Sequence, residues 1–367
     1  MRILSIETSC DETALALVDA KGTEAPSFKV HANLVSSQIP IHRPFGGVVP
    51  HLAKREHLKN LPLLLEELAR HDVKTTKRLV APEDYIVAMM KRVDAVAVTV
   101  GPGLEPALWT GINAAQDLAR RFGKPLIGAN HLEGHLYSFL LAAPTRTTKK
   151  KTIINLPAIG LIISGGHTML LEMSSLTSWK KIGETRDDAV GEAFDKVARM
   201  LSLPYPGGPE IEQAAKQGNP AAIAFPRPML DQQNFDFSFS GLKTAVLYHI
   251  KDLETHANPD TPFILDEAVR NDIAASFQTA VIETIIAKTM RAARQYHARS
   301  IIIGGGVAAN KTLRSIFEKA CEQEKLIFIT PARDAITDNA AMIATAAYMN
   351  TLTHTTRPIV AQSNLNL

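Results

Sequence analysis

Two histidines four residues apart, His131 and His135, are the side chains whose type and spacing most clearly suggest chemistry. They follow an apolar, strand-like run at 125–129. If a helix begins at His131, both rings lie on the same face of that helix. Neutral imidazole is the commonest nitrogen ligand of divalent transition metals, so the pair predicts a metal site with a third ligand from elsewhere. Two unrelated histidines are the alternative.

A polar turn at 8–13 is the second candidate, because it places Asp11 and Glu12 between two strand-like runs. Acids at strand ends can assist proton removal or support a metal site. The alternative is that both side chains only shape the turn through bonds to its backbone.

Two glycine-rich loops follow apolar strands, at 164–168 and at 304–310. Glycines let a backbone approach a phosphate closely, with its amides donating. Such loops at the ends of buried strands are typical of nucleotide sites in α/β proteins. We expect these two loops to face one another across a cleft between two lobes.

The order of elements predicts a duplicated α/β fold. Strand-like runs at 2–7, 14–19 and 28–35 predict an antiparallel meander, and the alternation of strand 94–100, helix 104–122 and strand 125–129 predicts parallel strands with covering helices. The second half repeats the opening pattern with strand 158–163, a turn and strand 169–173. We predict two lobes, 1–145 and 146–367. A helix with leucines at 58, 61, 65 and 68 should pack those leucines in a core.

Composition indicates a soluble globular protein. Among 367 residues, 46% are hydrophobic and 21% charged, and there is no apolar run of the length that spans a membrane. Only two cysteines occur, which favours a reducing cytoplasm. The net charge is +3, and the clustered Arg146, Lys149, Lys150 and Lys151 permit nucleic-acid contact, although a solvated loop is the alternative.

Taken in order, the motifs resemble one family over nearly the whole chain: the TsaD tRNA threonylcarbamoyltransferases, within the actin, sugar-kinase and heat-shock-chaperone fold group. The matching segments are IETSCDET at 6–13, GGVVP at 46–50, GPG at 101–103, HLEGH at 131–135, SGGHT at 164–168, GEAFDK at 191–196, YPGGP at 205–209, FSFSGLKT at 237–244, GGVAAN at 305–310 and TDN at 337–339.

The resemblance implies transfer of a threonylcarbamoyl group from threonylcarbamoyl-AMP to N6 of the adenosine at tRNA position 37, just 3′ of the anticodon, in tRNAs that read codons starting with adenine. His131, His135 and Asp338 match the family's metal ligands, with Fe(2+) favoured and Zn(2+) as the alternative. It also implies protein partners resembling TsaB and TsaE. The residues expected to bind the adenylate are Ile162, Ile163, Ser164, Gly165, Gly166, Asp195, Gly208, Glu212 and Asn310.

Three other functions compete with this one. A zinc peptidase requires a glutamate directly after the first histidine, whereas Glu133 lies about 200° around the helix from His131 and should face away from an ion. An actin-like ATPase would favour magnesium, which two histidines do not suit. A nucleotide-binding scaffold stays open. The segments 80–91 and 146–152 depart from the family pattern and read as insertions, which bear on partner contacts.

Overall fold

The computed structural model describes residues 1–73, 81–141, 154–257 and 262–367. The chain divides into two compact units: Met1–Thr152 together with Pro331–Leu367, and Ile153–Thr330. The predicted boundary near residue 145 lies outside the described residues. The predicted second lobe, 146–367, differs from the structure at its end, because 331–367 belongs to the first unit.

The first unit is built on a five-stranded mixed sheet in the order β3-β2-β1-β4-β5. In β1 and β4, side chains on both faces of the strand are buried, as expected for strands covered by helices. The strands are β1 (Arg2–Glu7), β2 (Glu12–Lys21), β3 (Ser27–Ser37), β4 (Ala95–Gly101) and β5 (Leu126–Asn130). The meander β1-β2-β3 is antiparallel and β1-β4-β5 is parallel, which confirms both predicted arrangements.

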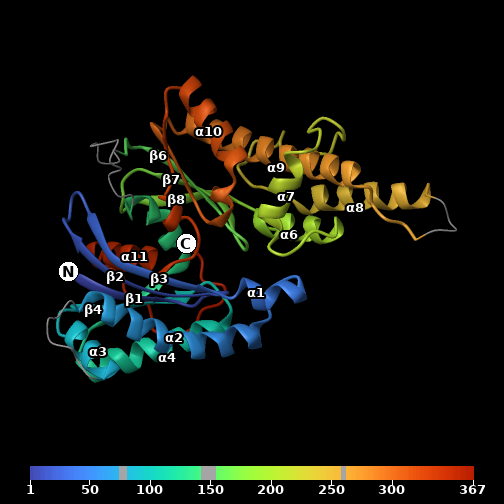
Figure 1. Cartoon of the computed structure of the whole chain (residues 1–367). Coiled ribbons are helices and arrows are strands. Elements are labelled where there is room, and N and C mark those ends of the chain that lie inside the picture. Colours follow the sequence, from blue (N-terminus) through green and yellow to red (C-terminus); the bar gives the residue numbers. More distant parts are fainter. Residues whose placement is uncertain (74–80, 142–153, 258–261) are drawn as a thin grey trace. The chain divides into compact units, whose positions relative to one another are not determined.

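Two long helices cover one face of this sheet, α2 (Pro50–Asp72) and α4 (Glu105–Phe122) (Figure 1). Proline at the first position of α2 suits a helix start, and Gly123 ends α4 in the left-handed conformation. The remaining helical segments of this part are α1 (Ile39–His42), η1 (Arg43–Phe45), α3 (Pro82–Met90), α5 (His131–Tyr137) and η2 (Ser138–Leu141).

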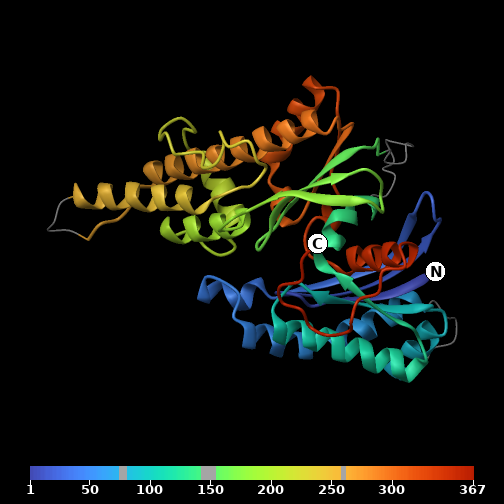
Figure 2. The same cartoon turned by 180° about the vertical axis from the view of Figure 1, so that it is seen from behind.

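The C-terminal segment covers the opposite face of the first sheet, as the view from behind in Figure 2 shows. After η4 (Arg333–Ala335), helix α11 (Ala340–Leu352) packs on β1 and β2 and is buried through Asn350. Its small alanines let the helix approach the strands closely. The residues beyond α11 also return to this sheet, since the Gln362 N–H donates to the Val100 carbonyl at 2.8 Å. A sheet needs both apolar faces covered, which explains why 331–367 joins the first unit.

The second unit repeats the same sheet. Its order is β10-β9-β6-β7-β8, with β6-β7-β8 antiparallel and β6-β9-β10 parallel, so every strand has a counterpart in the first sheet. The predicted duplication is therefore confirmed. The strands are β6 (Ala158–Ile163), β7 (Thr168–Met173), β8 (Trp179–Glu184), β9 (Ser300–Gly304) and β10 (Ile327–Ile329).

The described part of the second unit also contains six helical segments. They are α6 (Val190–Met200), α7 (Gly207–Ala215), α8 (Ser240–Thr255), α9 (Glu267–Gln295), η3 (Gly306–Ala309) and α10 (Lys311–Gln323). Among the helices of the described ranges, none is both long and apolar enough to cross a lipid bilayer. Both cysteines, Cys10 and Cys321, are free thiols.

Candidate metal centre and donor site

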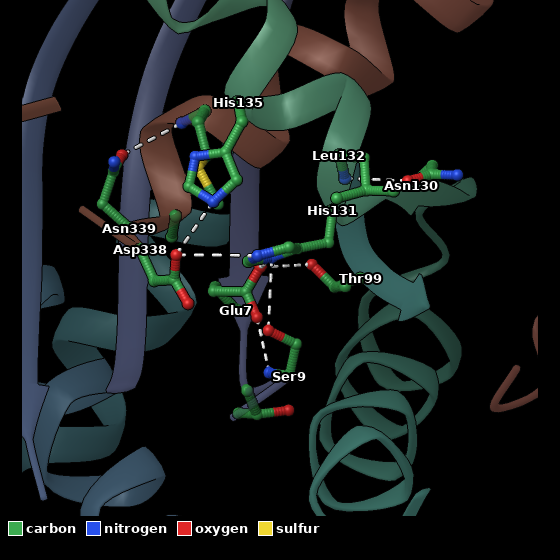
Figure 3. A network of polar contacts seen from close by, with 12 residues as sticks. Glu7, Ser9, Thr99, Asn130, His131, Leu132, His135, Asp338 and Asn339 are labelled. Carbon is green, nitrogen blue, oxygen red and sulfur yellow. Dashed lines mark hydrogen bonds and ion pairs between the residues drawn. The ribbon is translucent and has the colours of Figure 1, made fainter. Parts of the chain in front are cut away.

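Helix α5 begins where the sequence predicts. Asn130 is the last residue of β5, and its side chain caps the helix, with Oδ1 accepting from the Leu132 N–H at 2.8 Å. His131 and His135 then lie one helical turn apart on one face, with ring centroids 4.7 Å apart and both side chains buried. The short helix thus presents two imidazoles to the same volume (Figure 3).

Asp338 completes the group from the other end of the chain. It directly precedes Asn339, which caps α11 by accepting from the Met342 N–H at 3.0 Å. One carboxylate oxygen, Asp338 Oδ1, lies 3.0 Å from His135 Nε2 and 3.6 Å from His131 Nε2. The three potential ligand atoms all lie within 4.8 Å of one another. The residues of this group therefore gather as a cation site requires.

Glu7 fixes the orientation of the first imidazole. Its Oε2 lies 3.0 Å from His131 Nδ1 and accepts from the Thr99 hydroxyl at 2.7 Å, while Oε1 accepts from the Ser9 N–H at 2.5 Å. Ser9 Oγ also lies 3.2 Å from His131 Nδ1. A carboxylate bonded to Nδ1 leaves Nε2 free to bind a metal, which is the usual arrangement around metal-ligating histidines.

The charges around His131 favour a cation. Burial disfavours the charged ring, but the carboxylates of Asp338 and Glu7 outweigh burial and raise the pKa of His131 to about 9. Burial also acts against the Glu7 carboxylate, yet the neighbouring His131 holds the pKa of Glu7 below its usual range.

Two further observations fit a transition metal. His135 is buried, and within the described part of the chain neither of its ring nitrogens makes a hydrogen bond of good geometry, which is costly unless an ion engages one of them. The donor set of two imidazoles and one carboxylate suits iron or zinc better than magnesium. Glu133 forms an ion pair with Arg357, as expected for a side chain directed away from the ligand group.

The turn between β1 and β2 carries both predicted acids. Asp11 is buried, and burial together with the negative charges of Asp11 and Asp338 raises the pKa of Glu12 well above its usual value. Glu12 Oε1 accepts a hydrogen bond from Ser37 Oγ at 3.3 Å. The same causes raise the pKa of the Cys10 thiol, which keeps that group protonated and unreactive. Neither acid belongs to the group of three ligand residues.

The glycine loops are neighbours within one sheet rather than opposite each other. Strands β6 and β9 are paired in parallel with Ile162 beside Gly304, so the two loops leave the same edge of the second sheet. The expectation that they face one another across a cleft between lobes is therefore wrong. Carboxyl ends of adjacent parallel strands are where ligands bind in open α/β sheets.

Glycines at this edge leave space. A Cβ added at Gly165, Gly166, Gly208 or Gly306 would meet no atom within 4 Å. Gly305 differs, since its φ is +93° and a Cβ there would lie 2.5 Å from the Ile163 carbonyl oxygen. Gly305 is thus required by the backbone, whereas the other four glycines border open volume.

Three of the remaining predicted donor residues accept hydrogen bonds from N–H groups in the first turn of α7 or α10. Asp195 Oδ1 accepts from the Gly207 N–H at 2.7 Å, and Glu212 Oε1 accepts from the Lys311 N–H at 2.9 Å. Asn310 caps α10, its Oδ1 accepting from the Leu313 N–H at 2.9 Å while its Nδ2 donates to Gln278 at 2.9 Å. The sequence did not reveal that Asn310 already uses both ends of its amide within the protein.

Sequence reasoning missed Glu7 and Thr99, which support His131, because both look like ordinary strand residues. A fully buried acid needs a compensating partner, so an acid at the end of the apolar strand 2–7 was the available signal. The basic loop with Arg146, Lys149, Lys150 and Lys151 lies outside the described residues.

Solved structures with the same fold include two of HypF. The crystal structure of T. kodakarensis HypF has a TM-score of 0.51 at 13% identity, covering 76% of this chain and 44% of that one. Full-length HypF in the phosphate- and nucleotide-bound form also has a TM-score of 0.51, at 11% identity, covering 95% of this chain and 55% of that one. The fold and site define a duplicated, actin-like α/β protein with a His/His/Asp group in its first unit.

The family follows from sequence comparison. The model of the TsaD family, described as tRNA N6-adenosine threonylcarbamoyltransferase, matches residues 29–345. Relatives with that name include one from Moorella thermoacetica, 48% identical over 97% of this chain and 94% of its own length, and one from Thermosipho africanus, 43% identical over 95% and 94%. The chain belongs to the TsaD family and is an enzyme of the transferase class.

Proposed function

We propose that this protein transfers the threonylcarbamoyl group of threonylcarbamoyl-AMP to N6 of the adenosine at position 37 of tRNAs that read codons starting with adenine. The observation that carries the proposal is the buried His131, His135 and Asp338 group, oriented by Glu7, in a chain of this family. An adenine amine is a weak nucleophile because its lone pair is delocalised into the ring. The donor must therefore be an activated acyl group, which a mixed anhydride with AMP provides.

His131, His135 and Asp338 would hold one divalent transition-metal ion, with Fe(2+) favoured over Zn(2+). When bound, such an ion stabilises negative charge that develops on an acyl oxygen. Glu7 keeps the His131 ring in the orientation in which Nε2 faces the ion site. Both histidines must be neutral to bind such an ion.

Asp11 and Glu12 would serve the attacking amine, which loses a proton as the new N–C bond forms. A carboxylate at this turn can accept that proton, and a neighbouring protonated carboxyl can return one to a leaving group. The raised pKa of Glu12, caused by burial and the neighbouring Asp11 and Asp338, supports a role in proton transfer, because perturbed acids are typical of acid–base sites.

The edge of the second sheet would bind the adenylate. The open positions at Gly165, Gly166 and Gly208 allow the AMP phosphate and ribose to approach the backbone, whose N–H groups can donate to phosphate oxygens. Asp195 and Glu212, which carry the carboxylates of this edge, are suited to accept from ribose hydroxyls. Ile162, Ile163, Ser164 and Asn310 complete the proposed donor-binding set.

Function in cells would involve the cytoplasm and proteins resembling TsaB and TsaE. The absence of disulfides supports a reducing compartment. The partners follow from the family alone.

The test is incubation of the purified, metal-loaded protein with threonylcarbamoyl-AMP and unmodified tRNA, followed by digestion and mass analysis of the nucleosides. We expect N6-threonylcarbamoyladenosine in tRNA with adenosine at position 37 and none in a matched tRNA with guanosine there. The reaction is run alone and with the two partner proteins added. No modified nucleoside in either case would contradict the proposal, and ATP hydrolysis without transfer would favour an actin-like ATPase.

A further inference from the structure

A continuous series of hydrogen bonds links the start of helix α2 to the turn that carries Asp11 and Glu12. The Val49 N–H donates to His42 Nδ1 at 3.2 Å, and His42 Nε2 lies 3.1 Å from Gln38 Oε1. Gln38 Nε2 lies 3.2 Å from His57 Nδ1, and His57 Nε2 lies 3.0 Å from the Cys10 carbonyl oxygen. We refer to Gln38, His42 and His57 as the histidine relay.

The two ends of the relay fix its direction. A backbone N–H, that of Val49, can only donate, so His42 Nδ1 must accept and its Nε2 must carry the hydrogen given to Gln38. A backbone carbonyl, that of Cys10, can only accept, so His57 Nε2 carries a hydrogen and its Nδ1 accepts from Gln38. Each ring thus has one tautomer that satisfies every bond.

The relay lies in the protein interior, which favours neutral imidazole rings. Gln38, His42 and His57 are fully buried, and burial lowers the pKa of both rings. The Thr13 hydroxyl adds a bond to His57 Nδ1 at 2.8 Å, consistent with an acceptor at that atom. An added proton on either ring would place two donors against each other.

The relay ends on the backbone of the acidic turn. His57 bonds the Cys10 carbonyl, and the Gln38 N–H donates to the next carbonyl, that of Asp11, at 2.9 Å. Ser9, the residue before Cys10, is also held: its N–H donates to Glu7 Oε1, and its carbonyl accepts from the Leu104 N–H at 2.8 Å. Three consecutive residues of the turn are therefore held by buried groups from separate elements.

We infer that Gln38, His42 and His57 are positioning residues that hold the 9–11 turn, and with it the carboxyl groups of Asp11 and the adjoining Glu12, in the geometry needed for acyl transfer. The inference rests on the proposed roles of Asp11 and Glu12 and assigns a task to the GGVVP segment, whose Val49 starts the relay. A small displacement of groups that handle a proton lowers turnover without loosening substrate binding.

The test uses two substitutions at one position. In His57→Gln the new amide nitrogen can occupy the place of Nε2 and still donate to the Cys10 carbonyl, whereas in His57→Asn the shorter side chain cannot. His51→Asn is the matched control, because His51 is exposed on the same helix and lies outside the relay. We expect His57→Asn to lower kcat about 100-fold, with KM for tRNA and metal content unchanged, and His57→Gln to recover at least about tenfold of that loss.

Equal activity of His57→Asn and the parent protein would overturn the inference, as would equal loss in both His57 variants. Nitrogen-15 spectra of the histidine rings provide a readout independent of activity and of folding in the variants. The parent protein should show His42 and His57 as neutral rings with hydrogen on Nε2 only, and hydrogen on either Nδ1 would overturn the relay. Asp11→Asn, measured in parallel, separates the two proposals: full activity there refutes the acid assignment and not the relay geometry.

Discussion

Glu7 Oε2 lies 3.0 Å from Nδ1 of His131, although 124 residues separate them in sequence. The contact joins the end of the first strand to the first residue of helix α5, and it sets which nitrogen of the ring faces Asp338 (Figure 3). A buried acid outside the candidate ligand group thereby orients one of its two imidazoles.

Removing both histidines should abolish metal binding. The double variant His131→Ala/His135→Ala leaves a single carboxylate ligand, which cannot retain a transition-metal ion at micromolar concentration. Inductively coupled plasma mass spectrometry should find about one ion per parent protein and essentially none in the variant. The double variant His51→Ala/His71→Ala, which removes two exposed histidines of α2, is the control. Metal content equal to that of the parent would refute the ligand assignment.

Glu7→Gln should weaken the same site without removing a ligand. The amide keeps the size of the side chain but removes the negative charge that faces Nδ1 of His131. Loss of such a supporting carboxylate typically costs about 10–100-fold in metal affinity. Competition with a chromophoric chelator measures the affinity. Glu133→Gln is a matched change of a buried acid on α5 that faces Arg357 instead. An unchanged affinity in Glu7→Gln would show that the contact only supports folding.

Gly166→Ala should lower the affinity for the adenylate, whereas Gly305→Ala should lower the stability of the fold. A Cβ at Gly166 meets no protein atom, so Gly166→Ala should fold normally and lose affinity only for a ligand that occupies that space. A Cβ at Gly305 would collide with the Ile163 carbonyl at a φ of +93°, so Gly305→Ala should lower the free energy of unfolding. Calorimetry with a non-reactive adenylate analogue, together with thermal unfolding, distinguishes the two. Parent-like binding by Gly166→Ala would mean that the phosphate does not lie at this turn.

Asn310→Ala should lower the free energy of unfolding, whether or not it also lowers the affinity for the adenylate. The Asn310 side chain caps α10 and bonds Gln278, and loss of an N-cap costs about 0.5–2 kcal/mol. Urea denaturation measures that cost. Asn310→Ser keeps a capping oxygen and should restore most of it. If Asn310→Ser is stable but binds the adenylate analogue poorly, Asn310 also contacts the donor.

Stability should fall on mild acidification because of the buried relay. The pKa of His57 in the folded protein lies below its ordinary value of 6.5, so the unfolded chain takes up a proton first as the pH falls. The stabilisation by the neutral ring is thus complete above pH 6.5 and is lost progressively below it. The charged groups around His57 are Glu7 and Asp11, with His42 also facing it. Urea midpoints between pH 7.5 and 5.5 should decline less steeply in His57→Gln, and parallel curves would contradict this.

Local patterns predicted much of the fold. The positions of β1 to β7, the start of α5 at His131 and the direction of Glu133 follow from periodicity and capping within a few residues, whereas β8 and β10 were not predicted. The same reasoning placed four leucines of α2 in a core, which is wrong for Leu58: that side chain is 58% exposed, while Leu61 and Leu68 are buried. Periodicity predicts which residues share the apolar face of a helix, but not which of them the sheet covers.

What could not be predicted depends on contacts between distant segments. The partners of Glu7 and Gln38 could not be predicted, because Glu7 meets His131 only when β1 and α5 come together, and Gln38 meets His57 only when the end of β3 and α2 come together. The positions of the two glycine loops were misjudged for the same reason, since strand pairing, and not the loops themselves, decides that β6 lies next to β9.

The division of the first unit between both ends of the chain has a consequence for biosynthesis. A ribosome releases 153–330 as one uninterrupted stretch, whereas the sheet of the first unit waits for α11 to cover it and the histidines wait for Asp338. His131 and His135 therefore gain their third candidate ligand only after residue 338 has been synthesised. A product that lacks 331–367 would leave one apolar face of the first sheet uncovered and the two imidazoles without Asp338, and such exposed apolar surface favours aggregation.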